Sequence, residues 1–592
     1  MKFAVIGSGG REHAITWKLS QSKKVTEIFV FSNNPGMLEL GKKAPVNPND
    51  YHKLAEFLIS EKIDYTVIGP EDPLVDGLVD FLEEKGIKAF GPKKAAALLE
   101  GSKAFAKEVM VSANVPTAAY KEFTKAETAI TYLKQKNFYP AVIKADGLCA
   151  GKGVFIAGSF EEGEKFIKES LSGGSFGEAG KKIIIEDFLV GEEVSIFAVT
   201  DGKSVKYLSS AQDHKKIYEG DKGPNTGGMG TYAPASIISK DILEFLDQKY
   251  IQVVLNELKE RNIVYKGVLY AGFILTEDGP KVLEFNCRFG DPETQVILPL
   301  LETDFAELVA SVCDETLENL DIRLSPKKAV CFVAASGGYP GAYEKGKVIH
   351  GIKNVQSQIF FAGVEKKGEE YTTSGGRVLN IVAVENSIEE AREKVLFDIQ
   401  KIGFEGMQYR KDIAMREVSR AEVAVVMGSD SDLPIVAEGL KILQETGIGF
   451  KVYFLSAHRV PEVLIPVVQN WEYQGIKVVI AAAGMAAHLP GVIAGHTNLP
   501  VIGIPIESKM NGIDALYSIV QMPGGVPVAT VTIGKAGAQN AAILALQILA
   551  LSDSKKREKL KEYKNRQKLA VLEKNKLLQE IGYQEYLSRK KI

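Results

Sequence analysis

The residues that most clearly indicate chemistry are Glu284 and Asn286, within the segment VLEFNCRFGDPETQ that begins at Val282. The segment has the pattern of a β-strand, in which residues i and i+2 face the same side. A carboxylate beside an amide oxygen suits a hard Mg²⁺ ion that bridges nucleotide phosphates. An isolated pair of this kind is also common on a solvated edge strand, so the flanking motifs must decide. Together with them, the pair predicts an ATP-dependent enzyme.

Two lysines and two glutamates in earlier segments predict the remainder of a nucleotide site. The stretch AVIKADGLCAGKGV places Lys144 within a strand and Lys152 in a glycine-rich hairpin. A lysine buried in a strand needs an anionic partner, and a phosphate would supply one. The stretch IIIEDFLVGEEVS predicts a strand that ends at Glu186 and a loop to Glu193. Backbone groups there could meet adenine, and Glu193 could accept hydrogen bonds from ribose hydroxyls.

Two turns near the N-terminus favour a phosphorylated ligand. GSGGREH (7–13) follows a predicted strand and opens a helix, where backbone N–H groups and the helix dipole attract phosphate. It departs from the G-x-G-x-x-G fingerprint, and no acidic residue stands convincingly at the end of a second strand about 20 residues later. A phosphorylated substrate is therefore expected rather than a nicotinamide. GPEDP (69–73) places Glu71 and Asp72 at a strand end, although a plain turn explains it equally well.

A separate set of polar loops lies after residue 420. MGSDSD (427–432) offers a strand-to-helix turn suited to a ribose phosphate, with Ser429, Ser431 and Asp432. SAHR supplies His458 and Arg459, and AAGMAAHLPG supplies His488. A metal site formed by these histidines with His496 is conceivable, but no carboxylate or cysteine stands at ligand spacing. Proton transfer is the preferred interpretation, because histidine titrates near neutrality.

The elements that must position these residues fall into several domains. The 592 residues allow about four domains at roughly 150 residues each. Short apolar runs that end in Gly or Pro alternate with helical patterns over 1–102, which predicts a parallel sheet with crossover helices. Strands and hairpins at 141–157 and 182–199 predict an α+β domain over 103–323. A small closing domain (324–418), a second α/β unit (421–552) and a helical tail (553–592) follow.

The tail carries Leu560, Tyr563, Leu569 and Leu572 at near-helical spacing, which predicts an amphipathic helix used for core packing or a subunit contact. Its lysines are mixed with Glu and Gln, so nucleic-acid binding is not indicated.

Composition excludes several functional classes. Lys+Arg 72 against Asp+Glu 75 gives a net charge of −3, which favours neither nucleic acid nor a membrane surface. The four cysteines lack C-x-x-C spacing, so neither a disulfide framework nor a zinc site is indicated. The first apolar run is too short for a signal-peptide core, and no run reaches the ~18 apolar residues of a membrane span. A cytoplasmic enzyme with small-molecule substrates is expected.

Residues 1–418 resemble the glycinamide ribonucleotide synthetases (phosphoribosylamine–glycine ligases) of the ATP-grasp superfamily. Five motifs stand in that family's order: VIGSGGREHA, GPEDPLVDG, KADGLCAGKGV, QDHKKIYEGDKGPNTGGMGTYAP and LEFNCRFGDPETQ. The resemblance implies a Rossmann-like domain, an ATP-grasp α+β domain and a small closing domain. It also implies a reaction in which ATP converts the glycine carboxylate into an acyl phosphate, which the amine of 5-phosphoribosylamine then attacks.

The same resemblance assigns roles to individual residues. It implies that ATP is held by Lys103, Lys144, Lys152, Glu186 and Glu193, and that Mg²⁺ or Mn²⁺ is held by Glu284 and Asn286. Gly9, Asp213 and Arg288 would bind substrate, and Arg288 would also stabilise the charge of the transferring phosphate or acyl phosphate. The PNTGGMG loop (224–230) would line the acceptor site. His214 is about as readily a surface histidine as a substrate contact, and Cys149 and Cys287 are expected to be small apolar fillers.

Residues 421–552 resemble the class I N5-carboxyaminoimidazole ribonucleotide mutases of the phosphoribosylaminoimidazole carboxylase catalytic family. The matching motifs are MGSDSD, SAHRVP, AAAGMAAHLPG, YSIVQMPGGVPVATV and AGAQNAA. The resemblance implies a flavodoxin-like or Rossmann-like three-layer α/β domain, a homo-octamer, and movement of a carboxylate from the exocyclic nitrogen to C4 of the imidazole without a cofactor. His458 would be the general acid/base, Ser429, Asp432 and Arg459 would bind the ribotide, and His488 would shape the carboxylate pocket.

Several alternatives stay open beside this bifunctional purine-synthesis enzyme. Class II relatives use free CO₂ and aminoimidazole ribonucleotide, but they tend to carry a lysine after the SAH histidine and lack the AAHLPG loop. Arg459 and His488 therefore favour the mutase, whereas Met485 departs from an expected glycine. The first half could instead join another amine or ribotide, and the second half could be a non-catalytic scaffold that oligomerises the ligase. Because the two expected steps are not consecutive in the pathway, the fusion does not imply a channel.

Overall fold

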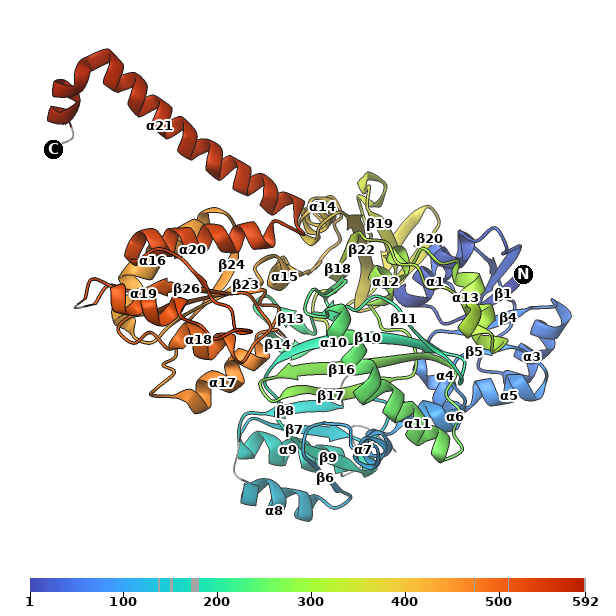
Figure 1. Ribbon diagram of the computed structural model, residues 1–592. Helices are drawn as coiled ribbons and strands as arrows, with labels where there is room; N and C mark the ends of the chain where they lie inside the picture. The colour runs from blue at the N-terminus through green and yellow to red at the C-terminus, as the bar shows by residue number, and fades with distance from the viewer. Residues whose placement is uncertain (137–138, 150–152, 172–179, 473, 509, 590–592) are drawn as a thin grey trace. The chain divides into compact units, whose positions relative to one another are not determined.

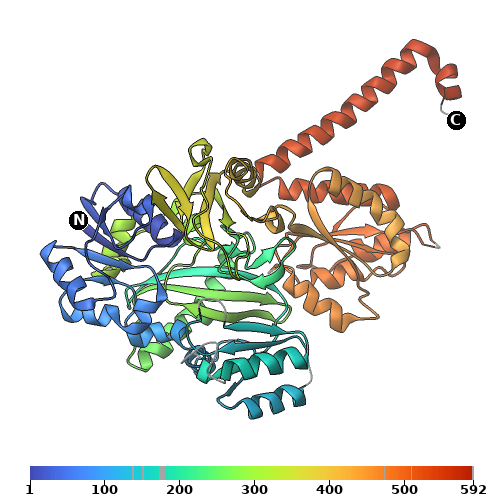
Figure 2. The ribbon, with the colours of Figure 1, turned by 180° about the vertical axis from the view of Figure 1, so that it is seen from behind.

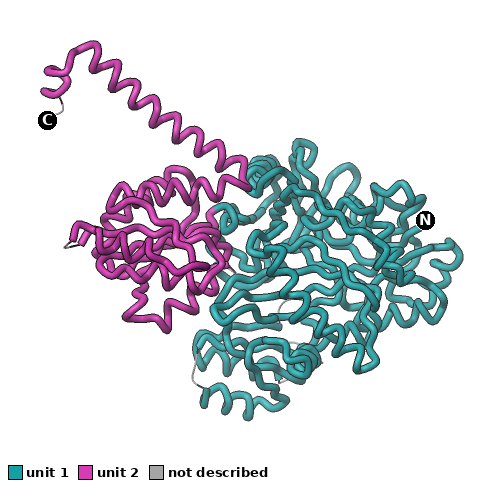
Figure 3. Tube along the Cα trace, in the orientation of Figure 1, with its two compact units in different colours: residues 1–418 teal, residues 419–592 magenta. Residues whose placement is uncertain are grey.

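The structure is a computed structural model that describes residues 1–136, 139–149, 153–171, 180–472, 474–508 and 510–589. The chain divides into two compact units, Met1–Val418 and Ser419–Ile592, which Figure 3 shows in different colours. Both are built of strands and helices, in agreement with the predicted α/β class.

The start of unit 1 folds around a parallel sheet in the order β3-β2-β1-β4-β5, as in Rossmann-like domains. The strands are β1 (Lys2–Ile6), β2 (Glu27–Val30), β3 (Lys42–Lys43), β4 (Tyr65–Ile68) and β5 (Ala89–Phe90). The strand order reverses between β1 and β4, and ligands of open α/β sheets bind at such a point, outside the carboxyl ends of the strands. The loop after β1 opens α1 (Gly10–Ser20) and the loop after β4 leads into α4 (Glu71–Asp76). The GSGGREH and GPEDP turns are therefore neighbours.

The middle of unit 1 contains two four-stranded sheets. The smaller has the order β6-β9-β7-β8 and is packed against α8 (Ala126–Lys136) and α9 (Phe160–Leu171), as Figures 1 and 2 show from opposite sides. Its strands are β6 (Tyr120–Phe123), β7 (Ala141–Ala145), β8 (Val154–Ala157) and β9 (Ile183–Asp187). The other sheet has the order β11-β10-β16-β17. Its strands are β10 (Glu192–Thr200), β11 (Val205–Tyr207), β16 (Gly267–Thr276) and β17 (Gly279–Asn286).

One expected hairpin is wrong. The stretch 182–199 forms β9 and β10, but these strands belong to different sheets, and Glu193 lies within β10 rather than in a loop. The intervening residues carry the chain from one sheet to the other. A Cβ on Gly191 would lie 2.3 Å from the carbonyl oxygen of Leu275. This crossing passes so close to β16 that it leaves no room for a side chain there.

A five-stranded sheet completes unit 1 in the order β12-β15-β18-β22-β19. It contains β18 (Lys328–Ala335), β19 (Gln358–Phe361) and β22 (Arg377–Glu385), together with β12 (Gln212–Asp213) and β15 (Gly230–Ala233). The last segment of unit 1 thus shares its sheet with two strands from the middle segment. In the sequence, β12 and β15 are separated by a hairpin of β13 (Lys216–Tyr218) and β14 (Lys222–Asn225). This arrangement places Asp213 at the border of two parts of the unit.

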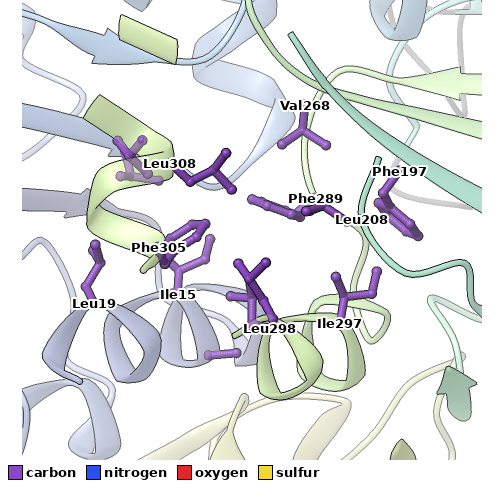
Figure 4. Packing of buried hydrophobic residues seen from close by; sticks show 14 of the residues in the cluster. Ile15, Leu19, Phe197, Leu208, Val268, Phe289, Ile297, Leu298, Phe305 and Leu308 are labelled. Atoms are coloured by element: carbon purple, nitrogen blue, oxygen red, sulfur yellow. The ribbon is translucent and has the colours of Figure 1, made fainter. Parts of the chain in front are cut away.

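A common hydrophobic core joins the parts of unit 1. Figure 4 shows Ile15 and Leu19 of α1 near Phe305 and Leu308 of α13 (Phe305–Cys313), with Leu298 of α12 (Thr294–Leu300) beside them. The same cluster includes residues of β1, β10, β16, β18 and β22. Because this core is continuous, α12 and α13 hold the N-terminal sheet against the sheets that carry Glu284 and Asp213.

Unit 2 has a parallel sheet in the order β24-β23-β25-β26-β27, the flavodoxin-like order. The strands are β23 (Ala421–Met427), β24 (Gly449–Phe454), β25 (Val478–Ala483), β26 (Val501–Pro505) and β27 (Ala529–Thr530). One face packs against α16 (Leu433–Glu445) and α20 (Gly534–Leu549). The other packs against α17 (Pro461–Asn470), α18 (Leu489–Ala494) and α19 (Ile513–Val520). The predicted three-layer fold is confirmed.

The tail forms the helix α21 (Ser554–Arg589), which is interrupted by non-helical backbone at Gly582. Leu560 and Tyr563 pack against the core of unit 2, whereas Leu569 and Leu572 are exposed. Within the described ranges, no helix is both long and apolar enough to cross a lipid bilayer.

Candidate functional site

The predicted nucleotide residues come together in unit 1. Lys144 on β7 and Glu186 on β9 are neighbours, with Lys144 Nζ 2.9 Å from Glu186 Oε2. Lys103 begins α7 (Lys103–Ser112) and donates from Nζ to the carbonyl of Gly147, 2.8 Å away in the loop after β7. Burial lowers the pKa of Lys103. Lys152 lies outside the described residues.

Lys107 also reaches this cluster, and we did not single it out from the sequence. Its Nζ lies 3.2 Å from Glu186 Oε1 and donates to Thr117 Oγ1 at 2.7 Å. Burial lowers the pKa of Lys107 to about 8, although Glu186 opposes that shift. Its spacing of one helical turn from Lys103 is a weak signal that could have found it.

Glu284 and Asn286 lie on β17, two residues apart, as predicted. Glu284 Oε1 is 3.6 Å from Lys215 Nζ, which is also 3.1 Å from Glu193 Oε2. The positive charge of Lys215 has the largest effect on Glu284 and lowers its pKa, and Lys144, Lys103 and Arg288 act in the same direction. Glu284 is therefore ionised at neutral pH and lies within the electrostatic reach of the two lysines predicted to bind the nucleotide, Lys103 and Lys144.

The donor set at β17 fits a divalent cation of the Mg²⁺ type. An ionised carboxylate and an amide oxygen are hard oxygen ligands, and Mg²⁺ commonly takes only one or two protein carboxylates, with water and phosphate oxygens filling the remaining positions. Glu284 and Asn286 could hold such an ion. Among the described residues there is no group of three or more His, Cys, Asp and Glu side chains arranged to hold a metal without other ligands.

Arg288 lies in a cluster of charges beside the N-terminal switch point. Its Nε donates to Glu71 at 3.0 Å and its Nη2 donates to Glu100 at 2.7 Å. Nη1 of Arg11 in α1 lies 3.6 Å from the same Glu71 oxygen. The Gly9 amide donates to Glu12 Oε2 at 2.6 Å, so the glycine loop is held in place. The arrangement brings the GSGGREH, GPEDP and NCRFGDPE motifs to one location.

The residues predicted to form the acceptor site lie at the sheet that is shared between the middle and last segments of unit 1. Asp213 ends β12, and a Cβ on Gly228 would be 2.8 Å from Asp213 Oδ1, so the PNTGGMG loop passes directly over this carboxylate. Burial, and then the negative charge of Glu293, raise the pKa of Asp213. Arg377 of β22 donates to Asp291 Oδ2 at 2.8 Å and to the carbonyl of Gly227. No sequence signal pointed to Arg377, because it is distant in sequence from every motif.

His214 is not a surface histidine, which was one of the two alternatives that the sequence left open for it. It is 3% exposed, and burial lowers its pKa to about 4. Nearby, the buried Arg410 donates to Asp412 and to Asp221 at the tip of the β13–β14 hairpin, which fixes the hairpin to the end of unit 1. His214 is therefore a buried packing residue next to Asp213.

The candidate site of unit 2 lies at the switch point between β23 and β25. His458 follows β24 and His488 follows β25, and Nε2 of His458 is 2.8 Å from Nδ1 of His488. Arg459 donates from Nη2 to the carbonyl of Gly428, which ties its loop to the MGSDSD turn. In that turn Ser429 accepts from the amide of Ser431. Burial raises the pKa of the adjoining Asp432. All five predicted residues thus lie in loops at the carboxyl ends of neighbouring strands.

The loop that delivers His488 has a left-handed backbone. Met485 has φ +54° and Ala487 has φ +33°, a conformation that favours glycine. This explains physically why glycine was expected at position 485. The Met485 side chain is 68% exposed, so its strain is not offset by burial within this chain.

Comparison with known proteins assigns each part of the chain to a family. Residues 1–100, 101–294 and 329–416 match the N, ATP-grasp (A) and C domains of phosphoribosylglycinamide synthetase. Residues 422–570 match AIR carboxylase. A phosphoribosylamine–glycine ligase of Caldanaerobacter subterraneus subsp. tengcongensis is 49% identical over 415 residues, which cover 70% of this chain and 99% of the relative. The trifunctional purine biosynthetic protein adenosine-3 of Bos taurus is 45% identical over 421 residues, which cover 70% of this chain and 42% of that protein.

Solved structures agree with the fold of unit 1. The crystal structure of phosphoribosylamine–glycine ligase from Thermotoga maritima has a TM-score of 0.62 and 34% sequence identity, covering 70% of this chain and all of that one. The biotin carboxylase domain of Hydrogenobacter thermophilus 2-oxoglutarate carboxylase has a TM-score of 0.54 at 18% identity, with 69% of this chain and 91% of that domain covered. At this identity, the second similarity shows a shared fold alone.

Proposed function

Because the chain belongs to the phosphoribosylamine–glycine ligase family over unit 1 and carries an AIR carboxylase domain in unit 2, we propose a reaction for each unit. Unit 1 joins glycine to the amine of 5-phosphoribosylamine, using ATP and a divalent cation. The γ-phosphoryl group moves to the glycine carboxylate, and the amine then displaces phosphate from the glycyl phosphate to form an amide. The products are glycinamide ribonucleotide, ADP and phosphate.

The observation that carries the ligase proposal is the charge arrangement around β17. Glu284 lies within electrostatic reach of Lys215, Lys144, Lys103 and Arg288. Lys103, Lys144 and Glu186 would bind the nucleotide, and Glu284 and Asn286 would hold a cation that neutralises the phosphates. The positive groups would stabilise the negative charge that develops during phosphoryl transfer. Asp213, with its pKa raised by burial, lies on the acceptor side and could take a proton from the attacking amine.

For unit 2, the proposed reaction is conversion of N5-carboxyaminoimidazole ribonucleotide to 4-carboxy-5-aminoimidazole ribonucleotide. The carbamate nitrogen must gain a proton when its carboxyl group leaves, and C4 must lose one after carboxylation. His458 is the proposed acid/base, and its contact with His488 supports this role. Ser429, Asp432 and Arg459 would hold the ribotide phosphate and ribose. A direct CO₂-using carboxylase is the main rival.

Self-association of unit 2, proposed as an octamer, is supported by its exposed apolar side chains. Ile513, Tyr517 and Val520 on α19 are 48%, 62% and 52% exposed and follow helical spacing. Phe454 at the end of β24 is likewise exposed. Exposed apolar side chains that line one face of a helix commonly mark a protein interface. His458 and His488 are exposed as well, so a neighbouring subunit could complete their site.

Two assays on the full chain test the proposal. Release of ADP and phosphate should depend jointly on glycine and phosphoribosylamine, and ATP cleavage with another amine alone would contradict the ligase assignment. For unit 2, the substrate labelled with ¹³C in its carboxylate should keep the label in an excess of unlabelled CO₂. Loss of the label to the pool would favour the direct carboxylase, and no turnover of either ribotide would favour a scaffold.

A further inference from the structure

A buried carboxylate between two lysines is the most distinctive charged cluster in the nucleotide site. Glu186 is 3% exposed. One of its oxygens lies 2.9 Å from Lys144 Nζ and the other lies 3.2 Å from Lys107 Nζ. The three groups together carry one positive charge. A single lysine would already neutralise Glu186, so the second lysine needs an explanation.

The two lysines are held very differently. The Lys107 side chain is 3% exposed, and its Nζ donates to Thr117 Oγ1 at 2.7 Å. Thr117 in turn donates to the carbonyl of Val282 at 2.7 Å, which anchors Lys107 to β17. The Lys144 side chain is 11% exposed, and its contact with the carbonyl of Leu283 is longer, at 3.4 Å. Lys107 thus has a second, short hydrogen bond besides Glu186, whereas the second contact of Lys144 is long and its side chain is the more exposed of the two.

This difference matters when a nucleotide arrives. A lysine that binds phosphate must give up at least part of its contact with Glu186. A buried carboxylate left without a partner is strongly destabilised, because it loses hydration without gaining an opposite charge. Lys107 remains in contact with Glu186 and prevents this.

We propose that Lys107 is a positioning residue, the permanent counter-ion of Glu186, and that it allows Lys144 to leave this carboxylate for the phosphates of the nucleotide. The inference rests on the proposed ligase function of unit 1. Without Lys107, Glu186 would hold Lys144 as its sole cationic partner and compete with the nucleotide for it. A purely structural role for Lys107 would instead weaken the fold without linking nucleotide affinity to the charge on Glu186.

Nucleotide binding to the full chain tests the proposal, measured by calorimetry with Mg²⁺ and the non-hydrolysable analogue adenylyl imidodiphosphate. Lys107→Met should raise the Kd of the analogue by at least about tenfold, since disrupting a buried ion pair commonly costs more than this factor. Lys107→Arg should bind nearly as well as the wild type. Lys203→Met is the matched control, because Lys203 also pairs with a glutamate, Glu315, but is 67% exposed. It should leave the Kd unchanged.

A double-mutant cycle separates the proposed role from a structural one. In a Glu186→Gln background there is no carboxylate to trap Lys144, so adding Lys107→Met should change the Kd by less than about threefold. This background also removes the buried carboxylate whose reduced pairing could weaken the fold of the single variant. Unchanged affinity in Lys107→Met, or an equal loss in both backgrounds, would overturn the proposal. A wild-type chain that binds no analogue would instead overturn the proposed ligase function.

Discussion

Replacing Glu284 by glutamine should disable the ligase while preserving the shape of its site. Glu284 is ionised and lies 3.6 Å from Lys215. Glutamine keeps an oxygen in place but removes the negative charge that would attract a divalent cation. Glu284 lies on β17 of unit 1, so unit 2 supplies an internal control in the same chain.

The size of the effect follows from the charges and their exposure. Two unit charges 4 Å apart interact by about 4 kcal/mol at an effective dielectric constant of about 20, and a divalent ion doubles this. The Glu284 side chain is 40% exposed, so water screens part of the interaction. We therefore expect a loss near that measured for removing one stabilising group at a reaction centre, about 2.7–4 kcal/mol, or ~10²–10³ in kcat.

The assay is glycine-dependent ADP formation by the full chain, over a range of Mg²⁺ concentrations, with mutase turnover measured in parallel. The double variant Glu284→Gln/Asn286→Asp moves the negative charge two residues along the same strand face. It should recover part of the activity and the Mg²⁺ dependence, because the net charge of the site is restored. A single Glu284→Gln variant within threefold of wild type would refute the assignment of the cation to this strand.

Three further predictions concern the site of unit 2, its backbone at Met485 and the assembly of the full chain. His458→Asn should lower the rate of carboxylate migration by ~10²–10⁴ without unfolding unit 2. Arg459→Ala should chiefly raise the KM for the ribotide. A His458 variant with wild-type turnover would move the acid/base role to His488. Met485→Gly relieves about 1–2 kcal/mol of left-handed strain but adds about 0.4–1 kcal/mol of unfolded-chain entropy, so the free energy of unfolding of unit 2 should rise by up to about 1.6 kcal/mol. Thermal unfolding that shows destabilisation would contradict the strain at φ +54°. Light scattering on the full chain should give an octamer, and a monomer with working mutase activity would refute the proposed assembly.

Local motifs were enough to predict much of both units. The sequence predicted that Glu284 and Asn286 share one face of a strand, because strand alternation depends on adjacent residues. It predicted the glycine turns after β1 and β4 for the same reason, since strand-to-helix turns are also local. The same holds for the loops of unit 2, where the MGSDSD, SAHR and AAHLPG motifs each follow a strand. The expected fold classes were confirmed for these reasons.

Long-range packing decided the rest. Short stretches of sequence predicted the phosphate-binding turns, the metal-type oxygens and the loop histidines, because these features depend on residues that are adjacent in the chain. Long-range packing placed β9 and β10 in different sheets, buried His214, and brought Arg377 to Asp291 and Lys107 to Glu186. Such pairs join residues far apart in sequence, so no local period or spacing reveals them. Their partners are selected by the way the sheets pack around the common core.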